Sequence, residues 1–492
     1  MAAKRNMINL LNKYPKQYWV LNIIQMIEKL AYWVVLMQMP VYIAQKDAAG
    51  GLHWGQSTKG MIFFVWAAVQ NLSPLLFGVW ADKYGRKKML FISFIIILVA
   101  YTLLGLFRDI SLFVTAIIIL AIGLGMFKPA LQGAIASSLN DKNSSTGWGL
   151  YFMLLNVAVF FGPALSKYLK DISWEMVFWG SAAIFSLNFF VLIFFKSVTF
   201  KDSDEGKKTN PKRHKELNLS FKKYVTDNVI TNLFKPQIFW LIIIMSGFMI
   251  IYMQFYETLP NFFIDWTDTS QIVTSIGLPD FLLMETDRGM MVSYEWLYTL
   301  NSVLIIGFIV IVARLLSGIN KSKVIAFGIL LSTIGLITIG SSMASMLTII
   351  GIIVYTFGEM TTNPKFNEYL GGIAPKNSKS TYLSYLNISF ALGLGIGSLL
   401  GGFLYGRFGE KATMAVNYLN SHYGIKDSIE PSQAMAILCE QANITMAEAT
   451  NLLWNQYDPY IVWLPFAMIG LASFIGMILY GKKYGYNSEN TP

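Results

Sequence analysis

Six ionisable side chains interrupt long apolar stretches of this sequence, and their chemistry is the most informative feature of the chain. Each charge costs roughly 2.5–3.5 kcal/mol to place in hydrocarbon, so an ionisable residue in such a setting is a candidate functional residue. The alternatives are a structural ion pair, or a long side chain that reaches a polar surface. The six residues are Glu28, Lys29, Lys128, Glu257, Glu359 and Lys365.

Lys128 and Glu359 form the most informative pair. Each lies beside residues that loosen a helix, since Pro129 follows Lys128 and Gly358 precedes Glu359. An ammonium and a carboxylate at matching depth suit a charge-compensated binding site, and protonating the acid would break their pairing. We favour a functional role for this pair over a structural one, whereas Lys365 lies nearer a helix end and is expected to reach the surface.

The elements that carry these residues are expected to be membrane-spanning helices. Hydrophobic residues make up 54% of the 492-residue chain and charged residues 13%, and the apolar runs suffice to cross a ~30 Å hydrocarbon core. The first run has no cleavage site after it and is interpreted as a spanning helix, not a signal peptide. We predict an all-α polytopic membrane protein with about twelve helices, at 18–45, 57–81, 88–107, 111–138, 145–168, 174–196, 237–262, 296–316, 322–341, 344–369, 380–406 and 459–481.

The charge distribution predicts the topology. The net charge is +10, and about two thirds of the 38 Lys and Arg residues fall in segments that are cytoplasmic if both termini are inside. The basic character is therefore attributed to topology, and nucleic-acid binding is not expected. The single cysteine, Cys439, excludes an internal disulfide, and the three histidines lie in polar connecting segments. We expect no metal site and no cofactor.

The polar segment 201–235 divides the chain into two predicted six-helix bundles, 1–200 and 236–492, with the segment itself as a cytoplasmic linker. A weak internal repeat supports this division, because a Lys-Asn-Ser turn and then a Tyr five residues before an Asn occur in both halves. Two outer-face segments, 263–295 and 407–458, are longer than connectors need to be. The second contains two predicted short helices that begin near Pro431 and Thr445, and we favour a packing cap over a gating or partner-binding lid.

A loop motif after the second predicted helix, "GVWADKYGRKK", matches the signature of the major facilitator superfamily. Gly78 and Gly85 allow a close helix approach and a tight turn, Asp82 can pair with a charge or a helix end, and Arg86 and Lys87 anchor the inner face. The motif predicts the major facilitator fold. In the helix 380–406, glycines recur at every fourth position from Gly393 to Gly401, a face suited to close helix packing.

The helices also resemble those of the proton-coupled oligopeptide transporters, a branch of that superfamily. "GLGMFKP" is similar to the family's Gly-rich Lys-Pro motif and places Lys128 at its proton-coupling lysine. "YTFGEMTTNPKFNEYLGGIAP" places Glu359 at the carboxylate that binds the substrate amino terminus. "YFMLLNVAVFFGP" and "LYTLNSV" resemble two further signatures and give Asn156 and Asn301 as pocket amides.

The sequence departs from the family pattern mainly in the substrate pocket. The family's Glu-x-x-Glu-Arg followed by two tyrosines is "QMIEKLAYW" here, which keeps Glu28 and Tyr32 but has Lys29 and Trp33. The pocket tyrosine of the second helix is replaced by Asn71. Glu257 lies one turn from the acid position of the seventh helix, so it is a candidate partner of Lys128. Proton coupling is therefore better supported than a peptide substrate.

The resemblance implies a proton-coupled symporter of small peptides or peptide-like solutes in a bacterial-type inner membrane, functional as a monomer. Lys29 and Lys128 would hold a substrate carboxylate, and Glu359, Asn156, Asn301 and Tyr32 an amine or polar groups. Glu28 and Glu257 would exchange protons. The alternatives are a proton-driven exporter of amphipathic compounds and a non-transporting receptor or assembly protein. An enzyme is not expected, because the sequence has no nucleophile–base pair and no phosphate-binding loop.

Overall fold

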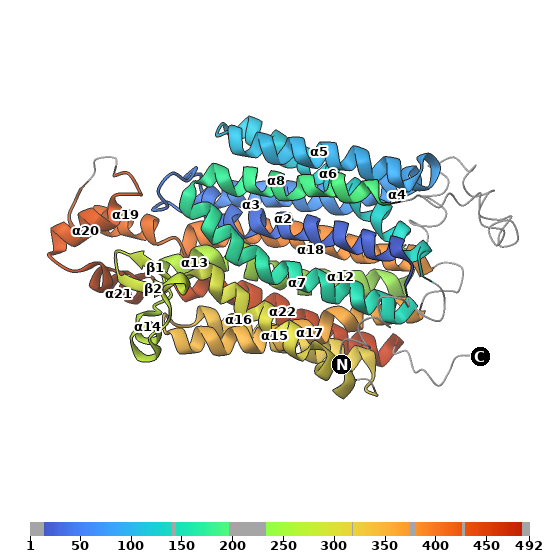
Figure 1. The fold of residues 1–492 in the computed structure, drawn as a ribbon. Helices are drawn as coiled ribbons and strands as arrows, with labels where there is room; N and C mark the ends of the chain where they lie inside the picture. The colour runs from blue at the N-terminus through green and yellow to red at the C-terminus, as the bar shows by residue number, and fades with distance from the viewer. Residues whose placement is uncertain are drawn as a thin grey trace, which may run out of the picture. The chain divides into compact units, whose positions relative to one another are not determined.

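The computed structural model describes residues 14–139, 144–195, 233–316, 318–373, 379–425 and 429–484 (Figure 1). The protein is an all-α polytopic membrane protein, as predicted. Within the described ranges, eleven helices are long and apolar enough to cross a membrane, and Tyr294–Ile309 is a shorter apolar stretch. The cytoplasmic location of the termini stays a prediction.

Most long helices begin and end within a few residues of the predicted positions, because their apolar runs are long. They are α2 (Lys16–Ala44), α3 (Gln56–Leu72), α4 (Pro74–Tyr84), α5 (Arg86–Leu106), α6 (Ile110–Ser137), α7 (Ser144–Ile172), α8 (Trp174–Ile193), α12 (Pro236–Glu257), α15 (Tyr294–Leu315), α16 (Lys321–Gly340), α17 (Ser345–Ile373), α18 (Lys379–Phe408) and α22 (Trp463–Tyr484).

Two predicted helices are interrupted at proline. The predicted helix 57–81 is divided into α3 and α4 at Ser73, because Pro74 at the start of α4 has no N–H to continue the backbone ladder. The predicted helix 237–262 is divided into α12 and the short α13 (Leu259–Asp265), which has Pro260 in its first turn. Both breaks lie beside candidate functional residues.

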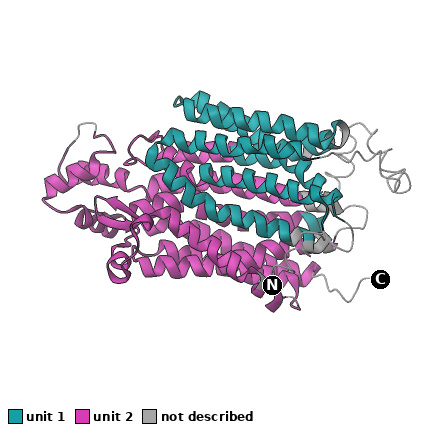
Figure 2. Ribbon diagram, in the orientation of Figure 1, with its two compact units in different colours: residues 1–35, 66–238 teal, residues 36–65, 239–492 magenta. Residues whose placement is uncertain are grey.

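The chain packs as two compact units that do not follow the chain order (Figure 2). Unit 1 contains Met1–Val35 and Trp66–Ile238, and unit 2 contains Leu36–Val65 and Phe239–Pro492. The continuous helices α2 and α3 are each divided between the units, which the predicted halves 1–200 and 236–492 do not anticipate. Residues 201–232 of the predicted linker lie outside the described residues.

In unit 1, α5 packs against α6 and α8, and α7 packs against α8. Phe94 of α5 contacts Phe127 of α6 and Phe185 of α8, with ring centroids 6.0 Å and 5.5 Å away. A Cβ on Gly123 would lie 2.7 Å from Ile97, so this glycine allows α6 to approach α5 closely.

In unit 2, α16 packs against α17 and α22, and α15 packs against α17. The predicted glycine face of α18 is confirmed. Added Cβ atoms at Gly393 and Gly401 would lie 2.3 Å from Met249 and 2.4 Å from Gln254, both in α12. The spacing of four residues places these glycines on one helix face, where they allow the two backbones to come together.

The two outer-face segments form small structures within unit 2. The first contains α14 (Ser270–Ile276), the 3-10 turn η2 (Asp280–Leu282) and an antiparallel hairpin of β1 (Leu283–Thr286) and β2 (Gly289–Val292), in which Leu283 pairs with Val292. The second contains α19 (Lys411–His422), α20 (Ala434–Ala442) and α21 (Met446–Tyr457), and the 3-10 turn η3 (Pro459–Val462) follows it. Thr445 starts α21 with a capping box to Glu448, as predicted.

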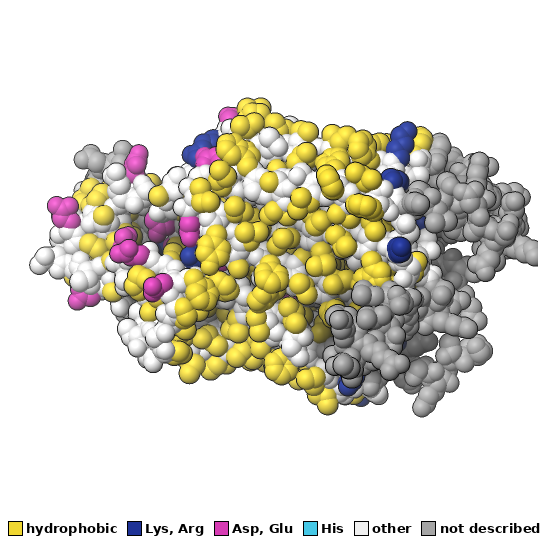
Figure 3. All heavy atoms as spheres, viewed as in Figure 1, with side chains coloured by type: hydrophobic (Ala, Val, Ile, Leu, Met, Phe, Trp, Pro, Cys, Tyr) yellow, Lys and Arg dark blue, Asp and Glu magenta, His cyan; other side chains and the backbone are white. Residues whose placement is uncertain are grey.

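The exposed side chains differ between the long helices and the outer segments. In Figure 3, hydrophobic side chains cover most of the visible face over the long helices, whereas Asp and Glu gather around α20 and α21. Exposed apolar side chains on helices of this length fit a lipid-facing surface.

Candidate functional site

In unit 1, Glu28 and Lys29 of α2 form a charged cluster around a buried carboxylate. Glu28 is 1% exposed, and its carboxylate accepts hydrogen bonds from Lys29 Nζ at 3.2 Å and Gln25 Nε2 at 3.1 Å. The Tyr151 hydroxyl donates to Gln25 Oε1 at 3.2 Å, so α7 supports this arrangement. Glu28 is therefore satisfied by a cation and an amide, as a buried carboxylate requires.

Lys128 of α6 lies near the same cluster, since its ammonium is within electrostatic reach of Lys29 and Glu28. The Lys29 ammonium also lies 4.7 Å from the centroid of the Tyr32 ring, a cation–π distance. The structure thus brings together four residues predicted as functional. Glu28 is a carboxylate whose charge attracts the Lys128 ammonium.

The glycines before Lys128 have a packing role. A Cβ on Gly125 would lie 1.7 Å from Ser73 Oγ, so α6 contacts the chain where α3 ends and α4 begins. A Cβ on Gly78 would lie 3.7 Å from Pro129. Helix α6 comes so close to Ser73 that no side chain fits at Gly125. This contact fixes α6, and with it Lys128, against the point where α3 ends and α4 begins.

The other predicted residues of unit 1 bond to their own helices or pack on aromatic rings. Asn71 Nδ2 donates to the Ala67 carbonyl at 2.9 Å, and Asn156 Nδ2 donates to the Phe152 carbonyl at 2.8 Å. Trp33 contacts the Tyr32 ring edge-on, with centroids 6.1 Å apart. Both of these hydrogen bonds use the amide nitrogen. The side-chain oxygen of an Asn is the atom that can accept a hydrogen bond from an amine.

In unit 2, Glu359 and Asn301 form a second buried site, which brings two predicted residues together. Asn301 Nδ2 donates to Glu359 Oε2 at 3.1 Å and to Thr356 Oγ1 at 2.9 Å. Glu359 is 7% exposed, and Tyr252 supplies a further hydrogen bond. Tyr355, which precedes Thr356 on α17, stacks on Phe255 with centroids 4.4 Å apart. The neighbours named here for this carboxylate are neutral donors, so it has capacity for a cationic group.

Glu257 lies in a third buried group, together with a lysine that sequence analysis missed. Ser398 Oγ donates to Glu257 Oε1 at 2.8 Å. Lys59, at 1% exposed, donates from Nζ to the Glu257 carbonyl at 2.9 Å and to Asn261 Oδ1 at 2.8 Å. The ammonium thus binds the last backbone carbonyl of α12, where the helix dipole favours a cation, and a side-chain amide of α13.

Polar contacts continue from Asn261 to a buried aspartate. Asn261 Nδ2 donates to Gln45 Oε1 at 2.8 Å, and Gln45 Nε2 donates to Asp265 Oδ1 at 2.7 Å. The Tyr405 hydroxyl donates to Asp265 Oδ2 at 2.6 Å. Burial raises the pKa of Asp265 from its ordinary 3.8 to about 6, and Asp47 adds to the rise, while Lys411, Tyr405 and Gln45 act in the opposite direction.

These contacts attach the segment Leu36–Val65 to the helices of unit 2, and we call them the outer lock: Gln45, Lys59, Glu257, Asn261, Asp265, Ser398 and Tyr405. Gly60 allows α3 to lie close to α18, since a Cβ added at Gly60 would lie 2.4 Å from the Ser398 carbonyl. The lock therefore joins parts of α2 and α3 to α12, α13 and α18 within unit 2.

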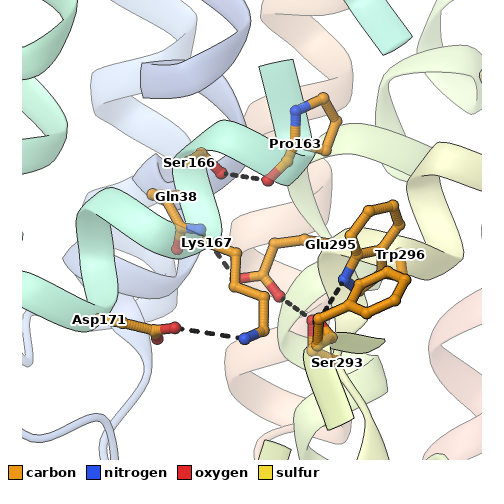
Figure 4. A network of polar contacts seen from close by, with 9 residues as sticks. Gln38, Pro163, Ser166, Lys167, Asp171, Ser293, Glu295 and Trp296 are labelled. Atoms are coloured by element: carbon orange, nitrogen blue, oxygen red, sulfur yellow. Dashed lines mark hydrogen bonds and ion pairs between the residues drawn. The ribbon is translucent and has the colours of Figure 1, made fainter. Parts of the chain in front are cut away.

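A separate buried carboxylate extends this attachment to α15. Gln38 Nε2 donates to Glu295 Oε1 at 2.8 Å, and Ser293 Oγ donates to Glu295 Oε2 at 2.7 Å (Figure 4). Glu295 is 1% exposed and lies in the first turn of α15, where a negative charge is favoured. Sequence analysis assigned no role to Gln38 or Glu295.

The loop motif has the geometry expected of a tight turn. Gly85 has φ of +94° and joins α4 to α5, a conformation that L side chains rarely adopt. The Arg86 guanidinium donates to Ser137 Oγ, and Lys87 Nζ donates to the Phe195 carbonyl. The side chain of Asp82 lies outside the described residues. Lys365, expected to reach the surface, pairs with Glu368 at 2.8 Å.

No group of three or more His, Cys, Asp and Glu side chains within the described ranges could hold a metal ion. The clusters instead pair carboxylates with amides, hydroxyls and ammonium groups. Such groups can bind the ends of a zwitterionic solute and exchange protons.

Comparison with known proteins decides the family. A family model described as Major Facilitator Superfamily matches residues 21–284 and 269–419. The chain belongs to the major facilitator superfamily. Members of this superfamily are transporters, so the chain is a multi-pass transport protein and not an enzyme.

Relatives of this major facilitator protein are distant. It is 23% identical over 370 residues to an uncharacterized MFS-type transporter YttB of Bacillus subtilis, covering 73% of this chain and 83% of the relative. It is 21% identical over 373 residues to a Na(+), Li(+), K(+)/H(+) antiporter of Planococcus maritimus, covering 74% and 83%. It is 23% identical over 217 residues to the quinolone resistance protein NorA of Staphylococcus aureus, covering 44% and 54%.

Solved structures confirm the major facilitator fold. A POT family transporter in complex with a thioalcohol conjugated peptide superposes with a TM-score of 0.66 at 15% identity, covering 95% of this chain and 96% of that one. A POT family transporter in complex with 5-aminolevulinic acid superposes with a TM-score of 0.65 at 16% identity, covering 94% and 95%. At these identities the likeness establishes the fold alone.

Proposed function

We propose that this major facilitator protein is a proton-coupled symporter of small peptides or peptide-like solutes in a bacterial-type inner membrane, working by alternating access. One observation carries the proposal: charges of opposite sign occur on different helices, with the partly buried Lys29 and Lys128 beside the buried Glu28 in unit 1 and the buried Glu359 beside Asn301 in unit 2. Buried charges within membrane helices are costly and mark substrate or proton sites.

The two clusters suit the two ends of a zwitterionic solute. Lys29 and Lys128 would hold its carboxylate, and Glu359 with Asn301 would hold its ammonium group. One structural neighbour was solved with a conjugated peptide, and the other with 5-aminolevulinic acid, which carries an amine and a carboxyl group; both support this substrate class. Lys29 replaces an arginine of the resembled family and gives up its two-pronged hydrogen bonding, so we expect weaker selection for carboxylate geometry.

Proton exchange is assigned to Glu28 and Glu257. The Glu28 carboxylate is near both Lys29 and Lys128. Protonating Glu28 would therefore remove the negative charge that attracts these two ammonium groups. This assignment makes Glu28 the acid that acts on Lys128. Glu257 would instead exchange its proton within the outer lock, where Ser398 and Lys59 are its neighbours.

The outer lock would control the position of Leu36–Val65, the part of α2 and α3 that belongs to unit 2. Moving this segment away from α12, α13 and α18 requires the lock to separate. Each of its buried hydrogen bonds must then be replaced by bonds to water. A proton or a solute can shift the equilibrium between the packed and the separated lock only by binding one of these two states more tightly.

A thermal-stability screen of the purified protein with di- and tripeptides tests the substrate class. A solute that binds the folded state raises the melting temperature by mass action, without a transport assay. We expect zwitterionic dipeptides to stabilise the protein, and the same dipeptides with an acetylated amino terminus to fail. Equal stabilisation by both forms would contradict the role of Glu359.

Export is the second candidate, and the relatives favour it. The quinolone resistance protein NorA and the cation/proton antiporter both match part of this chain. Resistance profiling of a strain that overproduces the protein separates the two functions. Raised resistance to amphipathic drugs, without any stabilisation by peptides, would support a proton-driven exporter.

A further inference from the structure

A groove between α12 and α22 lies outside every cluster described above. Its volume is about 570 Å³, within the ~300–1,000 Å³ range of ligand-binding sites. Its wall is apolar, formed largely by Trp240 and Ile244 of α12 and by Ala472, Gly476 and Leu479 of α22. All of these residues belong to unit 2.

Small residues of α22 create this groove. A Cβ on Gly476 would lie 3.2 Å from Ile244 Cγ1, so the two helices are close at this point and a larger side chain would fill the space between them. Ala472 is exposed one turn earlier and leaves the groove open. Trp240 is 51% exposed and Leu479 is 58% exposed, so the groove faces the surroundings of the protein.

One end of the groove is polar and cationic. Tyr480, Lys483 and Tyr484 line it, and Lys482 is exposed next to them. The Lys483 ammonium lies 5.2 Å from the centroid of the Tyr484 ring. The Tyr369 hydroxyl lies 3.2 Å from the Tyr480 hydroxyl and donates to the Tyr484 carbonyl at 3.2 Å, so this end is anchored to α17.

Neither α12 nor α22 has an acidic residue near Lys482 and Lys483 that could balance their positive charge. Helix α22 (Trp463–Tyr484) contains two lysines and no Asp or Glu, and the acid of α12, Glu257, is 17 residues from Trp240. At 1.5 Å per residue that separation is about 25 Å. A ligand that fits this groove therefore has a long apolar part and an anionic group at one end.

The length of the groove matches one leaflet of a bilayer. From Ile469 to Lys483, α22 advances about 21 Å, and one leaflet with its headgroup layer is roughly 20–22 Å thick. Lysines, tyrosines and a tryptophan at one end are also the residues that occupy the headgroup level of a membrane. A bilayer lipid is therefore the occupant with the matching dimensions and polarity.

We propose that this groove is a binding site for an anionic phospholipid. One acyl chain lies along Trp240, Ala472, Gly476 and Leu479, and the phosphate binds Lys482 and Lys483. The site would retain a lipid more tightly than the surrounding apolar surface does, because a cationic pair and a fitted groove act on the same molecule.

Native mass spectrometry of the purified full-length protein tests the site, with phosphatidylglycerol and phosphatidylcholine of identical acyl chains as probes. We expect phosphatidylglycerol to bind at least tenfold more tightly. Lys482→Gln with Lys483→Gln should lose most of that preference, since each lysine near the surface contributes about fivefold. Ala472→Phe, which fills the groove from an exposed position, should weaken both lipids.

Two matched variants serve as controls. Lys323→Gln removes an exposed lysine of α16, and Leu471→Phe enlarges an exposed residue of α22 outside the groove lining; neither should change lipid binding. Equal binding of the two lipids by the unaltered protein would overturn the proposal. So would a loss in Lys323→Gln as large as that in the double variant, or a dimer that Ala472→Phe dissociates, since a second copy would then occupy the groove.

Discussion

Replacing Lys59 by methionine tests the outer lock, because Lys59 is buried and donates two of the hydrogen bonds that hold Leu36–Val65 in unit 2. Methionine keeps most of the chain length and apolar volume but cannot donate. A hydrogen bond to a charged group is worth ~1.5–3 kcal/mol, so losing both should cost about 3 kcal/mol or more. The Glu257 carbonyl and Asn261 Oδ1 would also lose a partner in a buried site.

Amide hydrogen exchange measures the effect where it arises. Because every ~1.4 kcal/mol changes an equilibrium tenfold, local opening of the lock should become about 100-fold more frequent. Exchange should accelerate in peptides that cover residues 45–60 and 257–265 and stay unchanged in α5 and α6. Ser57→Ala, an exposed change in the same turn of α3, is the control.

The outer-lock account would be refuted by one clear result. If Lys59→Met changes exchange in these peptides by less than threefold, Lys59 does not stabilise the packing of Leu36–Val65. A general acceleration over all helices would show that the substitution disturbs the fold, in which case Lys59→Gln, which retains a donor, should restore most of the protection.

Three further predictions concern the same molecule. The pKa of Asp265, raised by burial to about 6, means that the packed lock binds a proton more tightly than an exposed aspartate with its ordinary pKa of 3.8. The contribution of Asp265 to the stability of the lock should therefore be greatest below pH 4 and fall by about 3 kcal/mol as the pH rises through 6, and Asp265→Asn should remove this contribution in pH-resolved hydrogen exchange. Glu359→Gln should reduce dipeptide stabilisation at least tenfold in apparent affinity, and Asn301→Ala by less, as measured by thermal shift; equal effects would contradict a charge-based role for Glu359. Gly85→Ala forces a side chain into a positive φ and should cost about 1–2 kcal/mol, seen as a lower melting temperature, whereas Gly307→Ala should not, since a Cβ there meets nothing within 4 Å.

The long helices could be predicted from sequence because each apolar run of about 20 residues has few other ways to satisfy its backbone in a membrane. The helix breaks were harder, since Pro74 and Pro260 fall within apolar runs where proline is sometimes tolerated. The hairpin 283–292 was missed because its strands are only four residues long and lack a clear alternation.

The candidate site was predictable in part. Glu359 could be found as a charge in an apolar run, whereas Asn301 was found through family resemblance, because their contact depends on how α15 packs against α17. Lys59 was missed because it lies in the first turn of a predicted helix, where a lysine is expected to reach water. Its burial follows from packing in unit 2, although Gly60 beside it is a signal of close helix approach.

The Glu28–Lys29 ion pair could not be predicted from residue spacing. Side chains at consecutive helix positions do not face one another, so spacing alone does not predict an ion pair. The pair forms at 3.1 Å because the long lysine side chain can return toward a carboxylate that burial leaves with few other partners.

The central claim is proton-coupled uptake that depends on Lys128, and a proton-flux measurement in vesicles tests it directly. Purified protein is reconstituted with a pH-sensitive dye inside, and a zwitterionic dipeptide that stabilises the protein is added outside. We predict acidification of the interior on dipeptide addition, and its loss in Lys128→Ala while dipeptide exchange between equal concentrations continues. Dipeptide entry without proton entry, or coupling that survives in Lys128→Ala, would contradict the account.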